Sequence, residues 1–240
     1  MRVAIMQPTY IPWIGYFALM DIVDLFVFYD DVQFVKSSWH HRNKIKMANG
    51  EIQWLTVPCY KEHLDTNIDE VLLKTSMSWE RKHWLSIYHS YCRAPYFSEY
   101  QSEIKKIYDL KWEKLVDLNL AIVSTMSNLL GINKPQIVRS SQLEDLSGKK
   151  TERVIDVLQK VGATEYISTV GTKVYLEADA RKLKDRNIDL KWFDYRIIEY
   201  PQMGDKFLPY LSVVDILFNN GDQAITYLKN GLINALESAD

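Results

Sequence analysis

Short, unbroken apolar runs near the start of the chain have the pattern of buried strands. Residues 2–6 and 24–31 each hold such a run, and two aspartates end the second one. Between them, Pro8 and Pro12 exclude a regular helix before position 12, and the stretch 12–20 then has the composition of a helix. A strand, a helix and a strand within about 30 residues are typical of a βαβ unit. Because both strands are apolar on both faces, we expect a parallel sheet.

One further strand pattern precedes the middle of the chain, and the alternation of strand and helix patterns returns in the second half. Further strands are predicted at residues 54–59, 136–141, 165–169 and 189–195. Helices are predicted at residues 151–162, 173–186, 209–218 and 222–237. Alternation at both ends of the chain indicates an α/β fold, with a three-layer, mostly parallel, Rossmann-like sheet of five or six strands.

The middle of the chain has a different pattern, because large apolar side chains recur over residues 79–131 at helical spacing. Pro95 separates two helices there, and Gly131 is suited to end the last one. We therefore expect residues 1–240 to form a single α/β domain with a helical insertion at about residues 79–131, without a sheet strand inside the insertion.

Composition narrows the classes of function. With 47% hydrophobic and 25% charged residues, the chain is globular, and its net charge of −2 argues against a nucleic-acid binder. The aromatic fraction of 12% favours a ring-lined pocket. No run reaches the ~20 apolar residues of a membrane span, and the first residues do not have the pattern of a signal peptide. Cys59 and Cys92 make neither a disulfide framework nor a zinc site, so we expect a cytoplasmic protein.

The first candidate site is the loop after the first strand, which holds Gln7, Tyr10 and Trp13. In an open α/β sheet, ligands bind at the carboxyl ends of the strands. A helix that begins there favours an anion. The alternative is a tight turn packed with aromatic side chains. The chain has neither a Gly-x-Gly-x-x-Gly motif nor a Walker lysine motif, so dinucleotide binding and P-loop chemistry are not expected.

The second candidate site follows the second strand, in a segment with few apolar positions. Its candidate residues are Asp31, Gln33, Lys36, Trp39, Arg42, Asn43 and Lys44. Arginine and lysine bind phosphates, Trp39 can stack a base or a sugar, and Asp31 is a catalytic carboxylate candidate. The alternative is a solvated basic loop. At most one of the adjacent His40 and His41 would face the site, and Asp31 with one histidine is not a ligand set, so no metal site is expected.

Two further positions carry candidate chemistry. His83 lies near the apolar stripe of its helix and is the best isolated general-base candidate, although a lone histidine in a helix is more often a structural residue. Ser168 and Gly171 stand where a strand passes into a helix, which suits phosphate binding through backbone N–H groups or an ordinary turn.

The loops after neighbouring parallel strands meet at the same edge of a sheet. We therefore expect Gln7, Tyr10, Asp31 and Arg42 to line one cleft.

Five blocks of the chain resemble the WbqC-like protein family. In order, they are MQPTYIPWIGYF, DDVQFVKSSWHHRN, WERKH, STVG and LSVVDILFNNG. They extend over nearly the whole chain, so the resemblance is specific. It implies a setting in bacterial O-antigen (lipopolysaccharide) and related surface-polysaccharide gene clusters. It also implies transfer of glycine or another acyl group to an amino sugar.

A more distant likeness is to the adenylate-forming ligases of the nucleotidyltransferase superfamily, such as pantoate–alanine ligase. The segments VAIMQPT, IPWIGYF and LFVFYDDVQF follow the order of strand, turn, helix and strand in that superfamily. The histidines of its His-x-Gly-His motif are missing here, so the likeness bears on the fold more than on adenylyl transfer. Lys36, Arg42 or Lys44 would have to stabilise the transferred phosphate instead.

Three functions follow from these observations. We favour a transferase that acylates or aminoacylates the amino group of a nucleotide-linked amino sugar, with Asp31 or His83 taking the proton. The second is an ATP-dependent adenylate-forming ligase or nucleotidyltransferase, whose magnesium ion Asp30 and Asp31 would help to hold. The third is a non-catalytic partner protein that binds a sugar nucleotide. The cofactor and the acyl donor are unknown from the sequence.

Overall fold

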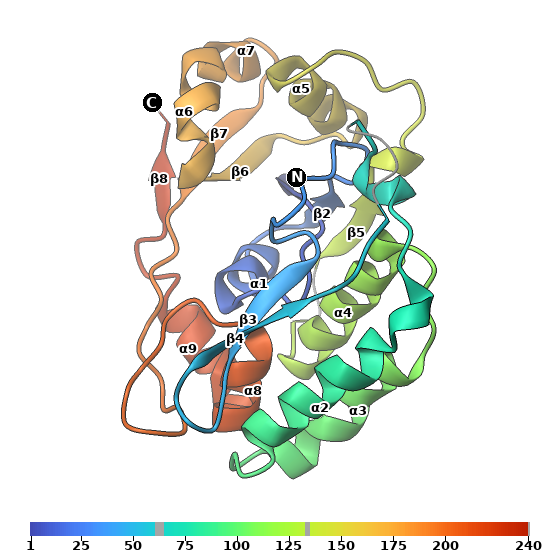
Figure 1. The fold of residues 1–240 in the computed structure, drawn as a ribbon. Helices are drawn as coiled ribbons and strands as arrows, with labels where there is room; N and C mark the ends of the chain where they lie inside the picture. Colours follow the sequence, from blue (N-terminus) through green and yellow to red (C-terminus); the bar gives the residue numbers. More distant parts are fainter. Residues whose placement is uncertain (61–64, 133–134, 240) are drawn as a thin grey trace.

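The computed structural model describes residues 1–60, 65–132 and 135–239, and Figure 1 shows its course. The strands are β1 (Arg2–Met6), β2 (Leu25–Phe28), β3 (Arg42–Lys46), β4 (Ile52–Thr56), β5 (Gln136–Arg139), β6 (Glu165–Thr169), β7 (Asp189–Phe193) and β8 (Leu236–Ser238). The α-helices are α1 (Ile14–Asp21), α2 (Trp79–Tyr91), α3 (Phe97–Asp109), α4 (Leu115–Leu129), α5 (Thr151–Lys160), α6 (Lys173–Leu176), α7 (Ala180–Lys184), α8 (Val213–Asn220) and α9 (Ala224–Asn230). Over the described ranges, no helix has the length and apolar character that a membrane span requires.

Six of the described strands form one sheet in the order β5-β2-β1-β6-β7-β8. Its pairs are parallel except that β8 runs antiparallel to β7. Val3, Ala4 and Ile5 of β1 are all buried, which explains the unbroken apolar run of this central strand. In the register of the sheet, Ile5 pairs with Val27 and Ala4 pairs with Ile167. The α/β fold with a mostly parallel, Rossmann-like sheet is thus confirmed.

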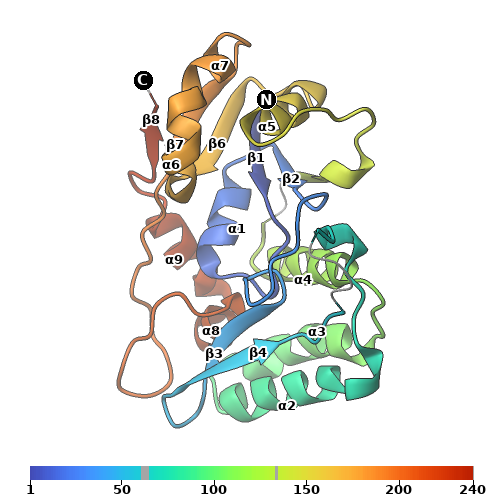
Figure 2. The same cartoon turned by 45° about the horizontal axis from the view of Figure 1, so that its top comes forward.

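Helices cover both faces of this sheet and complete the three layers. Leu25 and Val27 of β2 pack into a core with α5, α6 and α7 on one face. Phe26 and Phe28 of the same strand pack into a larger core with α1, α4 and α8 on the other face. Figure 2 shows α5, α6 and α7 on the side of the sheet away from α1, α4 and α8. Successive side chains of a strand point to opposite faces, so one strand contributes to both cores.

A long segment, residues 29–135, joins β2 to β5, which are neighbours in the sheet. It contains an antiparallel hairpin of β3 and β4, followed by α2, α3 and α4. Residues 79–131 are helical apart from their connections and contain no strand, as the sequence predicts. Trp79, His83 and Ile87 are one helical turn apart in α2, and all three are buried.

The β3–β4 hairpin differs from the sequence prediction. The strand predicted at 54–59 ends before Pro58, and it pairs with β3 instead of joining the main sheet. Strand β3 lies in the segment that the sequence predicts as a loop. Its Asn43 and Ile45 are buried while Lys44 between them is partly exposed, so a basic composition conceals an alternating strand.

Two predicted helices near the C-terminus are also corrected. The helix predicted at 173–186 is divided into α6 and α7 by a short 3-10 turn. The helix predicted at 222–237 stops at α9, where Gly231 lies against the ring of Tyr195 and an added Cβ would be 2.5 Å from its Cζ. Asn234 then adopts a left-handed conformation, with φ +59°, and directs the chain into β8.

Candidate functional site

The carboxyl ends of the parallel strands meet at one edge of the sheet, where the strand order changes direction. From β1 the chain continues to β2 and β5 on one side, whereas β6 and β7 lie on the other side. Such a switch point leaves a crevice outside the ends of the strands. Gln7 follows β1, Asp31 comes shortly after β2, and Gly171 comes shortly after β6. The topology therefore places three of the predicted residues along this edge.

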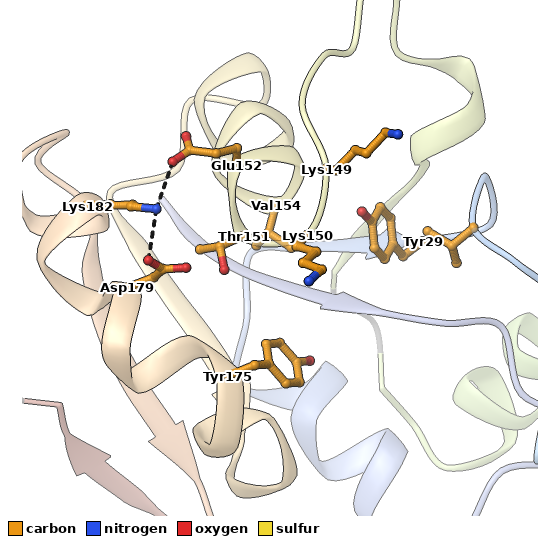
Figure 3. Close-up of a pocket in the computed structure, with 10 residues that line it drawn as sticks. Tyr29, Lys149, Lys150, Thr151, Glu152, Val154, Tyr175, Asp179 and Lys182 are labelled. Carbon is orange, nitrogen blue, oxygen red and sulfur yellow. Dashed lines mark ion pairs between the residues drawn. The ribbon is translucent and has the colours of Figure 1, made fainter.

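A cavity of about 800 Å³ opens at the same edge, and we call it the lysine cavity (Figure 3). It is lined by Tyr29, Val32, Lys149, Lys150, Thr151, Glu152, Val154, Tyr175, Asp179 and Lys182. These residues come from the segment after β2, from the start of α5, and from α6, α7 and the turn between them. The volume lies within the range of about 300–1,000 Å³ that is usual for small-molecule sites.

Two of the three lysines of this cavity are free to bind an anion. The Lys182 ammonium group pairs with Glu152 at 3.1 Å and with Asp179 at 2.9 Å, so its charge is neutralised. Within the part of the chain that the structure describes, neither Lys149 nor Lys150 has a hydrogen-bond or ion-pair partner for its side chain. Figure 3 shows the Lys150 side chain directed into the space between α5 and α6, with Lys149 farther out on the rim.

The start of α5 adds positive potential to the same wall. This helix has ten residues, and no side chain caps its first N–H groups. Free N–H groups and the helix dipole together favour an anion at this position. Gly148, with φ +77°, shapes the approach to the helix, because an added Cβ would lie 3.0 Å from the Glu152 Cβ. The left-handed backbone angle favours glycine, and the close approach leaves little room for a Cβ.

Two aspartates after β2 join the strand ends to the wall of the cavity. Asp30 is fully buried and accepts hydrogen bonds from Arg139 Nε at 2.6 Å and Ser141 Oγ at 2.9 Å. Asp31 pairs with Arg153, in the first turn of α5, and accepts a hydrogen bond from Ser140. The Asp31–Arg153 pair therefore holds the end of β2 against the start of α5.

In the described ranges, no group of three His, Cys, Asp or Glu side chains is placed to bind a metal ion.

Tyr29 and Tyr175 provide ring surfaces on two sides of the lysine cavity (Figure 3). Burial is the main reason that the pKa of Tyr29 rises to about 12, and the Asp31 charge adds to it. Burial also raises the pKa of Tyr175. Both phenols are therefore neutral at physiological pH, and they can donate hydrogen bonds to an anionic ligand.

A second, smaller cavity of about 270 Å³ lies at the end of β1, and we call it the aromatic cavity. Its lining residues are Met6, Thr9, Trp13, Tyr16, Trp39, Asn43 and Tyr210. Met6 packs against the core on the α1 face of the sheet, whereas Tyr29 packs against the core on the α5 face. The backbone N–H of Tyr29 donates to the Met6 carbonyl at 2.9 Å. The two cavities thus lie on opposite faces of the sheet, close to the same strand ends.

The aromatic cavity brings together three residues predicted from the sequence, Trp13, Trp39 and Asn43. Gln7 is exposed at the end of β1, and its Oε1 lies 2.9 Å from His40 Nε2. Burial lowers the pKa of His40 to about 4, so this ring is neutral at pH 7. Because His40 Nδ1 accepts from the Val35 N–H, its Nε2–H donates to Gln7 Oε1, and the Gln7 amide nitrogen is left to donate to a ligand.

Tyr10 does not line a cleft, which corrects the prediction of one cleft containing Gln7, Tyr10, Asp31 and Arg42. Tyr10 is fully buried, and its hydroxyl lies 2.7 Å from His83 Nδ1 and 2.9 Å from the Tyr108 hydroxyl. The loop after β1 thus turns this ring inward, against the helices of the insertion.

His83 belongs to the same buried cluster and lines neither cavity. Its ring also packs edge-on against Trp79, at a centroid distance of 5.3 Å. Burial lowers the pKa of His83 to about 4. The structure therefore gives His83 the surroundings of a core residue, and it is not brought together with Asp31.

The basic residues of the second candidate segment lie on or before the hairpin. Arg42 and Lys44 belong to β3, and the Arg42 guanidinium lies 4.7 Å from the centre of the Trp54 ring, not beside Asp31. Lys36 is exposed in the turn before β3, and Gln33 takes part in an isolated β-bridge. None of these four predicted residues lines the lysine cavity, and Arg42 and Lys44 lie on the hairpin instead.

The predicted residues after β6 lie at the switch-point edge but line neither cavity. Ser168 is buried, and its Oγ lies 2.8 Å from the Thr172 hydroxyl and 3.2 Å from the Tyr166 hydroxyl. Gly171 is exposed in the turn that follows. A ligand at the edge could reach Gly171, whereas the Ser168 hydroxyl is already used.

Sequence reasoning missed Lys149 and Lys150, which are the free cations of the larger cavity. The available signal was the run Gly-Lys-Lys-Thr just before a predicted helix. Glycine and lysine at a helix start are suited to an anion, even without the full spacing of a phosphate-binding motif.

Comparisons with known proteins agree with the resemblance that five blocks of the sequence indicate. The sequence profile of the WbqC-like protein family matches residues 7–227. The chain is also 36% identical over 231 residues to the uncharacterized protein Rv1507c of Mycobacterium tuberculosis, a match that covers 95% of this chain and 97% of that protein. No solved structure matches the chain significantly. The profile match extends over both cavities, and the chain belongs to the WbqC-like protein family.

Proposed function

We propose that the protein is a cytoplasmic transferase that acylates or aminoacylates the amino group of a nucleotide-linked amino sugar. The lysine cavity is the observation that carries this proposal. It lies at the switch point of the sheet, it contains two unpaired ammonium groups, and its volume of about 800 Å³ suits a nucleotide-linked sugar. The family resemblance is the reason for placing the reaction in the biosynthesis of O-antigen or a related surface polysaccharide.

The charges of the cavity suit the diphosphate of such a substrate. Lys150 and the open N–H groups of α5 lie at the same end of this helix, so they can contact phosphate oxygens together, and Lys149 adds positive charge at the rim. Tyr29 and Tyr175 provide faces for the base or the sugar ring.

The proposed reaction needs an acceptor for one proton. The neutral sugar amine attacks the carbonyl carbon of an activated acyl donor, the new N–C bond forms, and the bond to the leaving group breaks with its electron pair. The proton from the amine passes to a carboxylate, and Asp31 is the candidate at the edge of the cavity. Its neighbours in the chain, Tyr29 and Val32, line the cavity directly.

Substrate binding would change the surroundings of Asp31. Its oxygens are now engaged by Arg153 and Ser140. A phosphate at the start of α5 would compete for the Arg153 guanidinium, because arginine binds phosphate in a bidentate manner. In the proposal, binding of the diphosphate thereby frees one Asp31 oxygen for the amine.

The test combines binding with turnover. The protein is incubated with UDP-, dTDP- and GDP-linked amino sugars and with thioester or acyl-adenylate donors, and products are identified by mass spectrometry. We expect an acylated nucleotide sugar, and we expect Asp31→Asn to lower the turnover rate by about 100-fold or more while the nucleotide sugar still binds.

Other outcomes would replace the proposal. Pyrophosphate release that requires both ATP and an amine would identify an adenylate-forming ligase. Binding without turnover across all donors would identify a non-catalytic binding protein. Failure of every nucleotide sugar to bind would contradict the assignment of the lysine cavity.

A further inference from the structure

A group of half-exposed rings extends from the aromatic cavity onto the β3–β4 hairpin. Trp39, Trp54 and Tyr210 are 49%, 45% and 49% exposed. The rings of Trp39 and Trp54 lie 5.4 Å apart between centroids, at an interplanar angle of 34°. Trp13 supports Tyr210 from inside the cavity, with a centroid distance of 5.2 Å. Single exposed apolar side chains are ordinary, but a contiguous group of rings is characteristic of a binding surface.

Two cationic side chains lie beside these rings. The Arg42 guanidinium lies 4.7 Å from the centre of the Trp54 ring, and Lys44 is the cross-strand neighbour of Trp54 in the hairpin. In the described parts of the chain, neither cation has a carboxylate partner. The surface therefore combines ring faces with uncompensated positive charge, which favours an anionic ring compound.

The polar atoms of the cavity suit the hydroxyl and carboxylate groups of a sugar. The Asn43 amide is fully used, because its Nδ2 donates to two backbone carbonyls at 3.1 and 2.8 Å and its Oδ1 accepts from the Lys44 N–H at 2.8 Å. The indole N–H groups of Trp13 and Trp39 have no partner among the described residues. Indoles only donate, so they suit hydroxyl and carboxylate oxygens, and the Thr9 hydroxyl, which donates to the Gln7 carbonyl, can accept from a sugar hydroxyl.

We infer that the aromatic cavity and the outer face of the hairpin form a second ligand site, which binds an acidic sugar: a pyranose that carries a carboxylate or a phosphate. One ring enters the cavity of about 270 Å³, and its anionic group faces Arg42 and Lys44. The site shares no lining residue with the lysine cavity. It therefore goes beyond the proposed function, and either assignment can fail without the other.

The test uses small glycosides on the intact protein. Methyl glucuronide, its neutral counterpart methyl glucoside, thymidine monophosphate and a short thymidine oligonucleotide are each titrated, with tryptophan fluorescence and ligand-observed NMR as readouts. The variants are Trp54→Ala and Arg42→Gln. Ile52→Ala is the matched control, because Ile52 is 44% exposed on the same face of β4. Lys150→Ala reports on the lysine cavity.

We expect methyl glucuronide to bind saturably and about tenfold more tightly than methyl glucoside, because only the glucuronide has a charge for Arg42. Trp54→Ala should lower its affinity by about 5- to 150-fold, and Arg42→Gln by about tenfold. Ile52→Ala and Lys150→Ala should leave the affinity unchanged. Melting curves of all variants should stay close to that of the wild type, since these side chains are partly or largely exposed.

Several results would overturn the inference. Equal affinity for the two glycosides would remove the acidic preference, and tighter binding of the nucleotide or the oligonucleotide would assign the rings to bases. Loss of glucuronide binding in Lys150→Ala would place the sugar in the lysine cavity instead. An equal effect of Ile52→Ala and Trp54→Ala, or no saturable binding, would also contradict it.

Discussion

Replacing Asp215 tests how the core around α8 is held, because this carboxylate is fully buried. It accepts hydrogen bonds from the Tyr91 hydroxyl at 3.0 Å, the Tyr200 hydroxyl at 2.9 Å and Gln202 Nε2 at 2.8 Å. Burial raises the pKa of Asp215 from 3.8 to about 6, although these donors and the Lys46 charge act in the opposite direction. The protonated form is therefore the one that the core stabilises.

The sign of the pH dependence follows from this pKa. Between about pH 4 and pH 6 the folded state binds more protons at Asp215 than the unfolded state does, so the contribution to stability falls as the pH rises through this range. The difference from the unfolded pKa, converted at about 1.36 kcal/mol per pH unit, corresponds to about 3 kcal/mol in total. At pH 5 the contribution is about 1 kcal/mol more favourable than at pH 7.

The matched variants are Asp215→Asn and Asp215→Ala. Asparagine removes the titration but keeps an acceptor oxygen, and the tyrosine hydroxyls can rotate to accept from its amide. We expect Asp215→Asn to be at least as stable as the wild type at pH 7. Asp215→Ala leaves the two buried tyrosine hydroxyls without this acceptor and removes one acceptor of the half-buried Gln202 amide, so it should lower the free energy of unfolding by about 3 kcal/mol or more.

Urea denaturation of the three proteins at pH 5 and pH 7 measures these differences. The comparison of wild type with Asp215→Asn isolates this group from buried histidines such as His40, whose lowered pKa has the opposite effect on stability. An Asn variant with the same pH dependence as the wild type would refute the reasoning.

Three further predictions concern the edge of the sheet and the insertion. Arg139→Ala leaves Asp30 buried without its cation and should lower the free energy of unfolding by about 3–5 kcal/mol, measured in urea, whereas a loss below about 1 kcal/mol would contradict the importance of this pair. Gly148→Ala places a Cβ in a left-handed backbone position, so it should lower both the melting temperature and the affinity for the nucleotide sugar. Unchanged affinity would show that this turn does not contribute to the binding site. His83→Ala should cost about 1–3 kcal/mol of stability, because the Tyr10 hydroxyl loses a partner, yet leave the pH profile of turnover unchanged; loss of the acidic limb, where a general base is protonated, would restore His83 as a base.

The centre of the sheet could be predicted because β1 and β2 are apolar on both faces. Strand β3 could not, since the buried Asn43 is polar and satisfies its amide by bonding to backbone carbonyls that lie far away in the sequence. The helix predicted at 209–218 begins later, at Val213, after Tyr210 adopts φ +58°. A left-handed residue of this kind has no signal in the hydrophobic pattern.

The candidate site was predictable to the extent that topology determines it. Gln7 and Asp31 follow neighbouring parallel strands, so their place at one edge follows from the order of the elements. The wall that holds Lys150 is separated from them by more than a hundred positions and is formed only when α5 packs beside the sheet. Tyr10 was misplaced because a tyrosine in a loop can turn inward when buried hydroxyl and imidazole groups are there to receive it.

The binding of a nucleotide-linked amino sugar to the lysine cavity tests the central claim most directly. Calorimetric titrations would compare the wild type, a Lys149→Ala/Lys150→Ala variant and the control Lys160→Ala, which removes an exposed lysine at the other end of α5. We expect a loss of about 10- to 150-fold or more in the double variant, because each charge-assisted contact to phosphate is worth about 1.5–3 kcal/mol, and no change in the control. Equal affinity of all three proteins for the nucleotide sugar would contradict the assignment of this cavity as the substrate site.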